Sequence, residues 1–184
     1  MLSKKRIFKS SSEACEGNEE CKSSPKFRVS SCPFVPLPKE VPEPVFTSAY
    51  GSLYRTTAVI AVTGAYVDFD TVGPSSGTTL DIVNNSITVN SSGIYTITFS
   101  TKVNAVGLPA TPQSVFFILS INGIPIPEKE TAYQTETLNF IKISTISRTD
   151  QLMLNQGDII QIRIVVASPS ISYDDSALVV TKVA

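Results

Sequence analysis

The sequence predicts an all-β sandwich or barrel, and two observations support this prediction. Between residues 45 and 184, short segments alternate apolar and polar residues, the period of strands that bury one face. Breaks rich in Gly, Asn, Pro and Ser separate these segments about every 8–12 residues, and no window combines helical periodicity with capping residues. Hydrophobic residues make up 42% of the 184 residues, which is enough for a real core.

The pattern is clearest from Ser86 to Phe99. Ile87 and Val89 alternate with polar neighbours up to a break at 90–93, and beyond it large apolar residues alternate with Thr and Ser. The same reasoning predicts strands at residues 50–62, 80–83, 86–90, 94–103, 114–121, 137–144, 146–154, 159–167 and 177–183. Turn residues at 84–85 and 122–123 (Asn-Asn and Asn-Gly) separate neighbouring strands.

Two of these segments, 115–119 and 178–180, are apolar on both faces. A strand of this kind needs cover on two sides in an antiparallel sheet. The sandwich core covers one side, and we expect a second copy of the chain to cover the other. The expected interface has the obligate type, with a buried area of about 2,000–5,000 Å². Its candidate residues, for interface or core, are Tyr95, Phe116, Ile118 and Val179. The alternative is a loop of the same chain folded over that face.

Residues 1–44 differ in composition from the rest of the chain. They hold half of the twelve prolines and all three cysteines, Cys15, Cys21 and Cys32. Such a segment buries too little apolar surface to offset the entropy of ordering it. The sequence therefore predicts a flexible, disordered N-terminal arm at 1–44, extended and polyproline-like over 32–44, and a β-sandwich domain at 45–184.

The cysteine spacing fits no zinc site. Because their number is odd, at least one thiol stays free after any internal pairing, and intermolecular disulfides of Cys15, Cys21 and Cys32 are the favoured interpretation. Metal binding and reduced, unreactive thiols stay open as alternatives.

The composition argues against an enzyme, a cofactor and a metal site. The chain has no histidine, which removes the usual general base and the commonest zinc ligand. It also has no Gly-x-Ser-x-Gly elbow. Asp68 with Asp70, and Asp174 with Asp175, could serve a calcium site or a glycosidase, but no Asp-x-Asp-x-Asp-Gly loop is present. Hydrogen bonding in turns is the simpler interpretation.

Charge and hydropathy limit the partners. The net charge of −1 gives no electrostatic reason to expect nucleic acid, and no apolar run reaches the ~18 residues of a membrane helix. The basic start lacks an apolar stretch after it, so we expect no secretory signal peptide. Thr88, Thr96, Thr98 and Thr101 are expected to face solvent, with a sugar- or partner-binding surface as the alternative.

Three parts of the chain, taken in order, resemble a known family. They are residues 77–99, the segment Leu152-Met153-Leu154-Asn155-Gln156-Gly157-Asp158-Ile159-Ile160, and the closing residues 177–184. Together they resemble the TNF/complement C1q jelly roll, and more closely its bacterial branch on Bacillus spore surfaces, the BclA and ExsF/BxpB exosporium type. The resemblance spans about residues 48–184. It implies a jelly-roll sandwich, a homotrimer and a place on the spore surface, in exosporium or coat.

The N-terminal arm departs from the BclA type. Residues 1–47 contain a single glycine, Gly17, and so hold no Gly-X-Y collagen stalk. This favours a basal or linking role. We therefore expect a structural, non-enzymatic protein of the exosporium or an appendage, which forms homotrimers and anchors or links other spore-surface proteins through its arm. The alternative is a trimeric glycan- or receptor-binding head of a surface filament or phage fibre.

Overall fold

A computed structural model describes the fold for residues 47–106, 112–136 and 141–184. The expected arm, its three cysteines and the expected boundary near residue 45 lie outside the described residues. Within these ranges the chain forms strands and turns, so the all-β prediction is confirmed, and no helix there could cross a bilayer. The strands are β1 (Tyr50–Arg55), β2 (Val59–Ile60), β3 (Thr71–Val72), β4 (Thr78–Asp81), β5 (Ser86–Val89), β6 (Gly93–Val106), β7 (Gln113–Ile121), β8 (Ile124–Thr135), β9 (Ile141–Leu154), β10 (Ile159–Ala167) and β11 (Ile171–Lys182).

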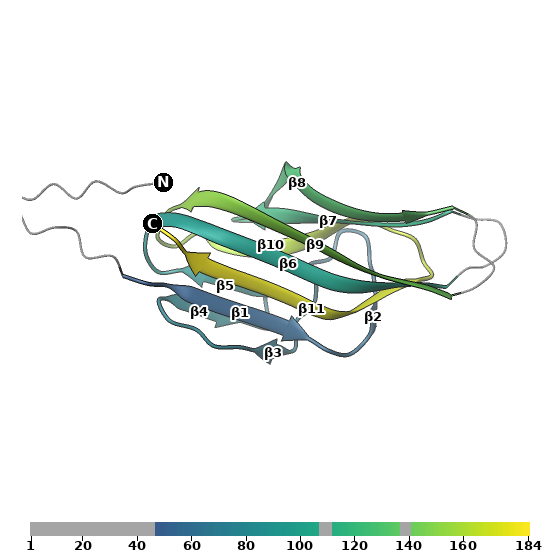
Figure 1. The fold of residues 1–184 in the computed structure, drawn as a ribbon, viewed down its shortest axis with the longest axis horizontal. Helices are drawn as coiled ribbons and strands as arrows, with labels where there is room; N and C mark the ends of the chain where they lie inside the picture. The colour runs from purple at the N-terminus through teal and green to yellow at the C-terminus, as the bar shows by residue number, and fades with distance from the viewer. Residues whose placement is uncertain (1–46, 107–111, 137–140) are drawn as a thin grey trace, which may run out of the picture. The chain divides into compact units, whose positions relative to one another are not determined.

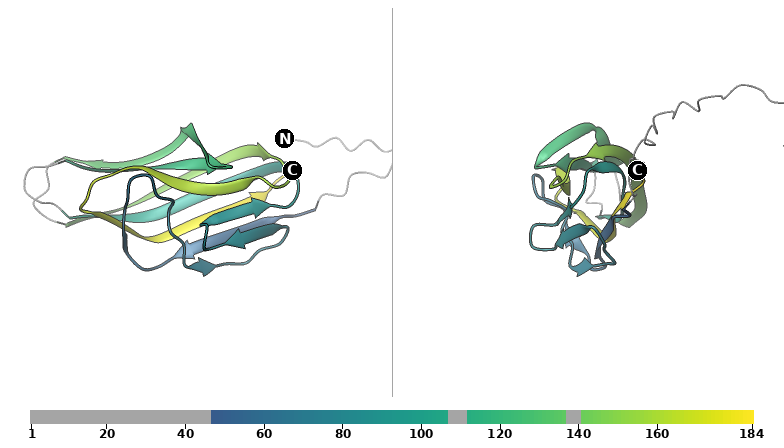
Figure 2. Two further views of the ribbon diagram at one scale, coloured as in Figure 1. Left: turned by 180° about the vertical axis from the view of Figure 1, so that it is seen from behind. Right: turned by 90° about the vertical axis from the view of Figure 1, so that its left-hand side faces the viewer.

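The strands form two antiparallel sheets that pack face to face (Figure 1). Sheet A has the order β3-β1-β11-β6-β9, with β2 also paired to β11, and sheet B has the order β4-β5-β10-β7-β8. The first and last strands of the domain, β1 and β11, are neighbours in sheet A. The views from behind and end-on show the two layers of strands (Figure 2).

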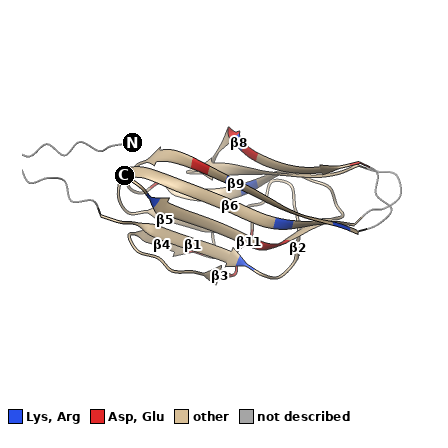
Figure 3. Ribbon diagram, in the orientation of Figure 1, with Lys and Arg blue, Asp and Glu red and all other residues tan. Residues whose placement is uncertain are grey.

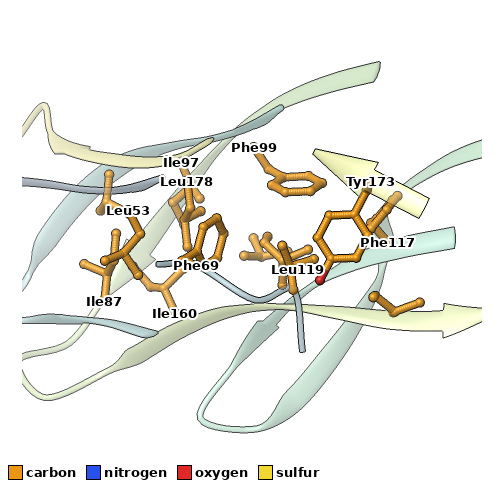
Figure 4. Packing of buried hydrophobic residues seen from close by; sticks show 14 of the residues in the cluster. Leu53, Phe69, Ile87, Ile97, Phe99, Phe117, Leu119, Ile160, Tyr173 and Leu178 are labelled. Carbon is orange, nitrogen blue, oxygen red and sulfur yellow. The ribbon is translucent and has the colours of Figure 1, made fainter. Parts of the chain in front are cut away.

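Alternating side chains from both sheets fill this core. Phe117 of β7 lies between two other aromatic residues, with ring centres 5.3 Å from Phe99 and 5.9 Å from Tyr173 (Figure 4). Burial raises the pKa of Tyr173, and its phenol oxygen accepts a hydrogen bond of 2.9 Å from the Asp68 backbone N–H. The buried strand faces thus come from the period-2 pattern that the sequence shows.

The Asn122-Gly123 turn that joins β7 to β8 has the conformation expected for these residues. Both have positive φ angles, 53° at Asn122 and 77° at Gly123, as in a type I′ hairpin turn. The Asn122 side chain also accepts a hydrogen bond of 2.9 Å from the backbone N–H of Ile159 and donates one of 2.8 Å to Asp158. The turn is therefore tied to the start of β10.

The strand boundaries differ from the predicted ones in several places. The short strand β3 is not predicted, and β11 begins at Ile171 where the prediction begins at 177. The sequence pattern predicts no strand at β8, and this is wrong: Pro125 and Pro127 are tolerated because β8 is an edge strand. The segments 137–144 and 146–154 do not form separate strands, since β9 is continuous from Ile141 to Leu154, and residues 137–140 are not described. The segment 50–62 is divided into β1 and β2.

Candidate self-association surface

Tyr95, one of the four residues predicted for interface or core, lies in the core of the protomer. Its side chain is fully buried between the sheets, on the face of β6 that also carries Ile97 and Phe99. Its phenol donates a hydrogen bond of 2.7 Å to the Ser91 carbonyl. Tyr95 therefore stabilises the single domain.

Phe116 and Ile118 alternate with the core residue Phe117 and so belong to the outer face of sheet B. Phe116 is half-buried, but Ile118 is only 5% exposed. The strand register places Ile118 between Arg163 of β10 and Glu130 of β8. The aliphatic stems of these long side chains can cover it. Ile118 is thus buried within one chain.

The outer face of sheet A is different, because its centre is uncharged. The strands of sheet A are mainly tan in Figure 3, with few coloured charged positions. We call the outward residues of β6 and β9 in this region the neutral face: Thr96, Thr98, Ser100, Thr145, Ser147, Thr149 and Gln151. The hydroxyls of Thr98 and Thr149 lie 3.0 Å apart across the two strands. A lack of charge is typical of the centre of a protein–protein interface.

Exposed aliphatic side chains flank the neutral face at both ends. At one end Val106 is 46%, Ile141 63% and Ile143 60% exposed, and Val106 pairs with Ile141 across the strands. At the other end Met153 is 69% exposed and pairs with Ile94. Burying such side chains contributes about 1.5–3 kcal/mol each. Val179 of β11 is half-buried on the same outer face, opposite Thr98.

Ion pairs lie at one end of the neutral face, between it and Ile143, because Lys102 is the outward partner of Thr145. Lys102 lies 2.8 Å from a carboxylate oxygen of Asp174 and 2.8 Å from one of Asp175. Hydrogen bonds to Asp174 and Asp175 raise the pKa of Lys102. Asn104 donates a further bond of 3.0 Å to Asp174. The Asp174-Asp175 pair thus holds a lysine of β6.

The second carboxylate pair also holds a cation. Arg55 contacts Asp68 at 2.7 Å and Asp70 at 3.8 Å, while Asp70 accepts a hydrogen bond from Thr71 at 2.7 Å. Within the ranges that the structure describes, no three His, Cys, Asp or Glu side chains are grouped to hold a metal ion. Both pairs therefore have a structural explanation in the fold.

A charged cluster joins the two sheets where the edge strands β8 and β9 meet. We call Lys129, Arg148 and Asp150 the edge latch. Asp150 is 9% exposed and accepts hydrogen bonds from Arg148 Nε at 2.7 Å and Lys129 Nζ at 2.9 Å. Arg148 also donates to the backbone carbonyls of Glu130 and Glu128 at 2.7 and 2.8 Å. Inward-pointing charges of this kind protect exposed sheet edges from pairing with other strands.

The threonines predicted to face solvent do not behave alike. Thr96 and Thr98 lie on the neutral face and Thr88 on the outer face of sheet B, all partly exposed. Thr101 is fully buried, so the prediction is wrong there. Its hydroxyl lies 2.7 Å from that of Ser176 and donates to the Asp174 carbonyl at 3.1 Å. The reason is the alternation of side chains along β6. Thr101 lies two residues after the buried Phe99 and therefore points to the same inward face.

The sequence reasoning missed the aliphatic residues that flank the neutral face. Ile141 and Ile143 are odd-numbered, whereas the inward residues of the same strand, such as Leu152 and Leu154, are even-numbered. Aliphatic residues out of phase with the core predict an exposed apolar patch. This signal was present in the sequence.

Comparisons with known proteins complete the description of the fold. No family model and no curated protein matches the sequence. Among solved structures, the Eiger TNF from S. frugiperda superposes with a TM-score of 0.58 at 15% identity, over 74% of this chain and 93% of that one. The globular domain of zebrafish complement 1qA superposes with a TM-score of 0.53 at 14% identity, over 75% and 98%. The chain has a TNF/C1q-like jelly roll. At this level of identity the likeness of the jelly roll establishes its fold alone.

Proposed function

We propose that this chain is a structural, non-enzymatic protein that self-associates through the neutral face and its flanking aliphatic residues. The observation that carries the proposal is the exposure of Ile141, Ile143 and Met153 at the two ends of an uncharged sheet surface. Apolar side chains that no charged neighbour covers are stabilised when a second copy covers them.

The fold supports a trimer as the form of this association. Domains with the TNF/C1q-like jelly roll commonly form trimers. In a closed ring of three, each copy presents one part of its surface to another part of the next copy. The neutral face supplies one side of such a contact.

A place on the spore surface is the further part of the proposal. It is supported by the resemblance of residues 77–99, 152–160 and 177–184 to the exosporium branch of the family. The arm would then anchor or link the trimer to other spore-surface proteins, with Cys15, Cys21 and Cys32 forming intermolecular disulfides. Three arms on one trimer raise the strength of attachment without any new kind of contact.

Light scattering of the purified full-length chain tests the association. Thr149→Arg places a charge in the middle of the neutral face, so we expect the measured mass to fall about threefold, from trimer to monomer. The matched control is Thr88→Arg, a threonine on the outer face of sheet B, which should leave the mass unchanged. A monomeric unmodified chain, or equal effects of both variants, would exclude the proposed surface.

Extraction of native spore layers tests the location and the disulfides. The protein should remain insoluble in denaturant without reductant and dissolve once a thiol is added. A triple variant with all three cysteines changed to serine should dissolve without reductant. If the protein is absent from spore layers, the proposed location is wrong. If it is released as a monomer without reductant, the proposed disulfide cross-link is wrong. A glycan that binds the full-length chain in an array screen would favour the ligand-binding head instead.

A further inference from the structure

A shallow groove of about 290 Å³ lies on the outer face of sheet A, along β1 and β11. Its lining includes Tyr50 and Tyr54 of β1, Val179 and Thr181 of β11, and Pro74 from the loop after β3. None of these side chains is charged. The groove borders the neutral face, because Val179 and Thr181 of its lining pair with Thr98 and Thr96 of β6.

The local backbone holds the aromatic side chains of the groove in place. A Cβ atom at Gly73 would collide with the Tyr54 ring and with Ser52 Oγ, so only glycine allows this close approach. Ser52 Oγ also lies 3.4 Å from the Pro74 carbonyl, which ties the loop to the strand. Neither the Tyr50 nor the Tyr54 phenol makes a hydrogen bond within the described residues. Both phenols can therefore donate to a ligand.

Grooves lined by aromatic side chains bind polyproline helices in several domain families. The tyrosine rings pack on proline rings, and their phenols donate to the backbone carbonyls that this helix leaves unpaired. A ligand of this chemistry is apolar, rich in proline and extended. The sequence contains such a segment, Pro33-Phe34-Val35-Pro36-Leu37-Pro38, which carries no charge and has two of its three prolines, Pro33 and Pro36, three residues apart.

We propose that the Tyr50/Tyr54 groove binds residues 33–38 of a neighbouring copy of this chain. The inference rests on the proposed function, because it assigns a docking partner to the arm of a self-associating protein. The lengths agree: six residues of polyproline helix span about 19 Å. The six residues of β1 that carry the two tyrosines span about 20 Å.

A neighbouring copy supplies the segment because the same chain is poorly placed to do so. The described chain starts at Thr47, three residues before Tyr50 in the groove. For residues 33–38 to enter their own groove, the intervening residues 39–49 would have to reverse direction. Val41 and Glu43 each precede a proline, and a residue in that position is held extended. Two such positions between the segment and the groove disfavour this reversal in the sequence.

Fluorescence anisotropy with a labelled peptide tests the docking. The peptide carries residues 31–46 with Cys32→Ser, and the acceptor is the full-length chain with Pro33, Pro36 and Pro38 changed to serine, so that its own segment does not compete. We expect saturable binding. A peptide in which the same three prolines are serine should bind at least about tenfold more weakly.

Two groove variants of this acceptor locate the site. Tyr54→Ala removes one aromatic wall, and Thr181→Lys adds a charge at an exposed position without changing the core. Each should weaken peptide binding at least about tenfold, whereas Tyr66→Ala, a tyrosine that bridges to β10 of sheet B, should leave it unchanged. No saturable binding, or unchanged binding in both groove variants, overturns the proposal.

Two further outcomes separate this inference from the proposed function. Thr149→Arg should leave peptide binding unchanged, because Thr149 lies on β9, two strands away from β11 and outside the groove lining. If the groove variants instead reduce the chain to a monomer in light scattering, a second domain covers the groove and the proposal fails.

In the unmodified chain, peptide binding should weaken as protein concentration rises. Equally weak binding at every concentration would mean that each segment fills its own groove, which overturns the assignment to a neighbour.

Discussion

On the outer face of sheet B the outward Ile118 is 5% exposed, whereas on the outer face of sheet A the outward Ile143 is 60% exposed. The difference lies in the neighbours across the strands. Ile118 is flanked by Arg163 and Glu130, whose long side chains can cover it. Ile143 is paired with Asn104, which is too short to do so.

This comparison refines what an apolar residue on an outward strand position means. In isolation, the run of apolar residues at 115–119 indicates that something must cover a second face. Ile118 is nevertheless buried within a single chain, and the stems of its charged cross-strand neighbours can supply this cover. An outward aliphatic residue favours a partner only where its cross-strand neighbour is short and uncharged, as for Ile143, which pairs with Asn104 beside the neutral face.

The largest expected effect contrasts the inner and outer faces of β7. Phe117→Ala removes a fully buried ring from the centre of the core, so we expect a loss of about 3–5 kcal/mol in the free energy of unfolding. Phe116→Ala, one residue earlier on the half-buried outer face, should lose less than about 1.5 kcal/mol. Urea denaturation at one protein concentration measures both. Equal losses would contradict the assignment of the two faces.

The next effect concerns the edge latch. Hydrogen bonds from Arg148, and also from Lys129, lower the pKa of Asp150 below its usual value. Its folded pKa thus lies below its unfolded pKa of about 3.9, so its contribution is full above that pH and is lost as pH falls through the folded pKa. Asp150→Asn should lower the free energy of unfolding by about 2 kcal/mol at pH 7.

The pH dependence provides the control for that variant. Urea midpoints of the unmodified chain should fall as the pH drops below about 4, and the gap to Asp150→Asn should narrow over the same range. Ser147→Ala, on the opposite face of β9, should follow the unmodified chain at each pH. A constant gap at all pH values would show that the charge of Asp150 does not stabilise the fold.

The strand β9 shows how much of this could be predicted from the sequence. Its alternation of apolar and polar residues correctly predicts a strand. Leu152 and Leu154 show which face of that strand is buried, and the same alternation then puts Arg148 and Asp150 on the inward face and Ile143 on the outward face. The sequence therefore contained both the edge latch and the exposed patch. Interpreting them required the phase of each residue in addition to its polarity.

Other features depend on contacts that the sequence does not encode locally. The sequence does not predict β8 because Pro125 and Pro127 disfavour a strand, except at the edge of a sheet, where β8 lies. The cover of Ile118 depends on the register of three strands, and a register is fixed by long-range packing. The groove beside Tyr54 depends on Gly73 in a loop far along the chain.

A smaller effect tests the exposed patch of sheet A. Ile143→Ser should leave the stability of the single domain nearly unchanged, because the side chain is 60% exposed. It should weaken self-association about tenfold, since it removes apolar area from the proposed interface. The matched control is Ile124→Ser, an isoleucine 70% exposed at the β7–β8 turn, which should not alter association. Sedimentation over a range of concentrations measures both, and equal effects would show that exposure alone explains the result.

The smallest effect tests whether the charged side chains of sheet B act through their stems. Arg163→Ala removes the cover on one side of Ile118 and should lower the free energy of unfolding by about 0.5–1 kcal/mol. Arg163→Met keeps most of the aliphatic stem without the charge, so its urea midpoint should stay close to that of the unmodified chain. If Arg163→Met loses as much as Arg163→Ala, the charge of Arg163 is what stabilises this face. Other side chains would then have to cover Ile118. The outer faces of the two sheets would differ in the charge of their residues and not in the cover that those residues give.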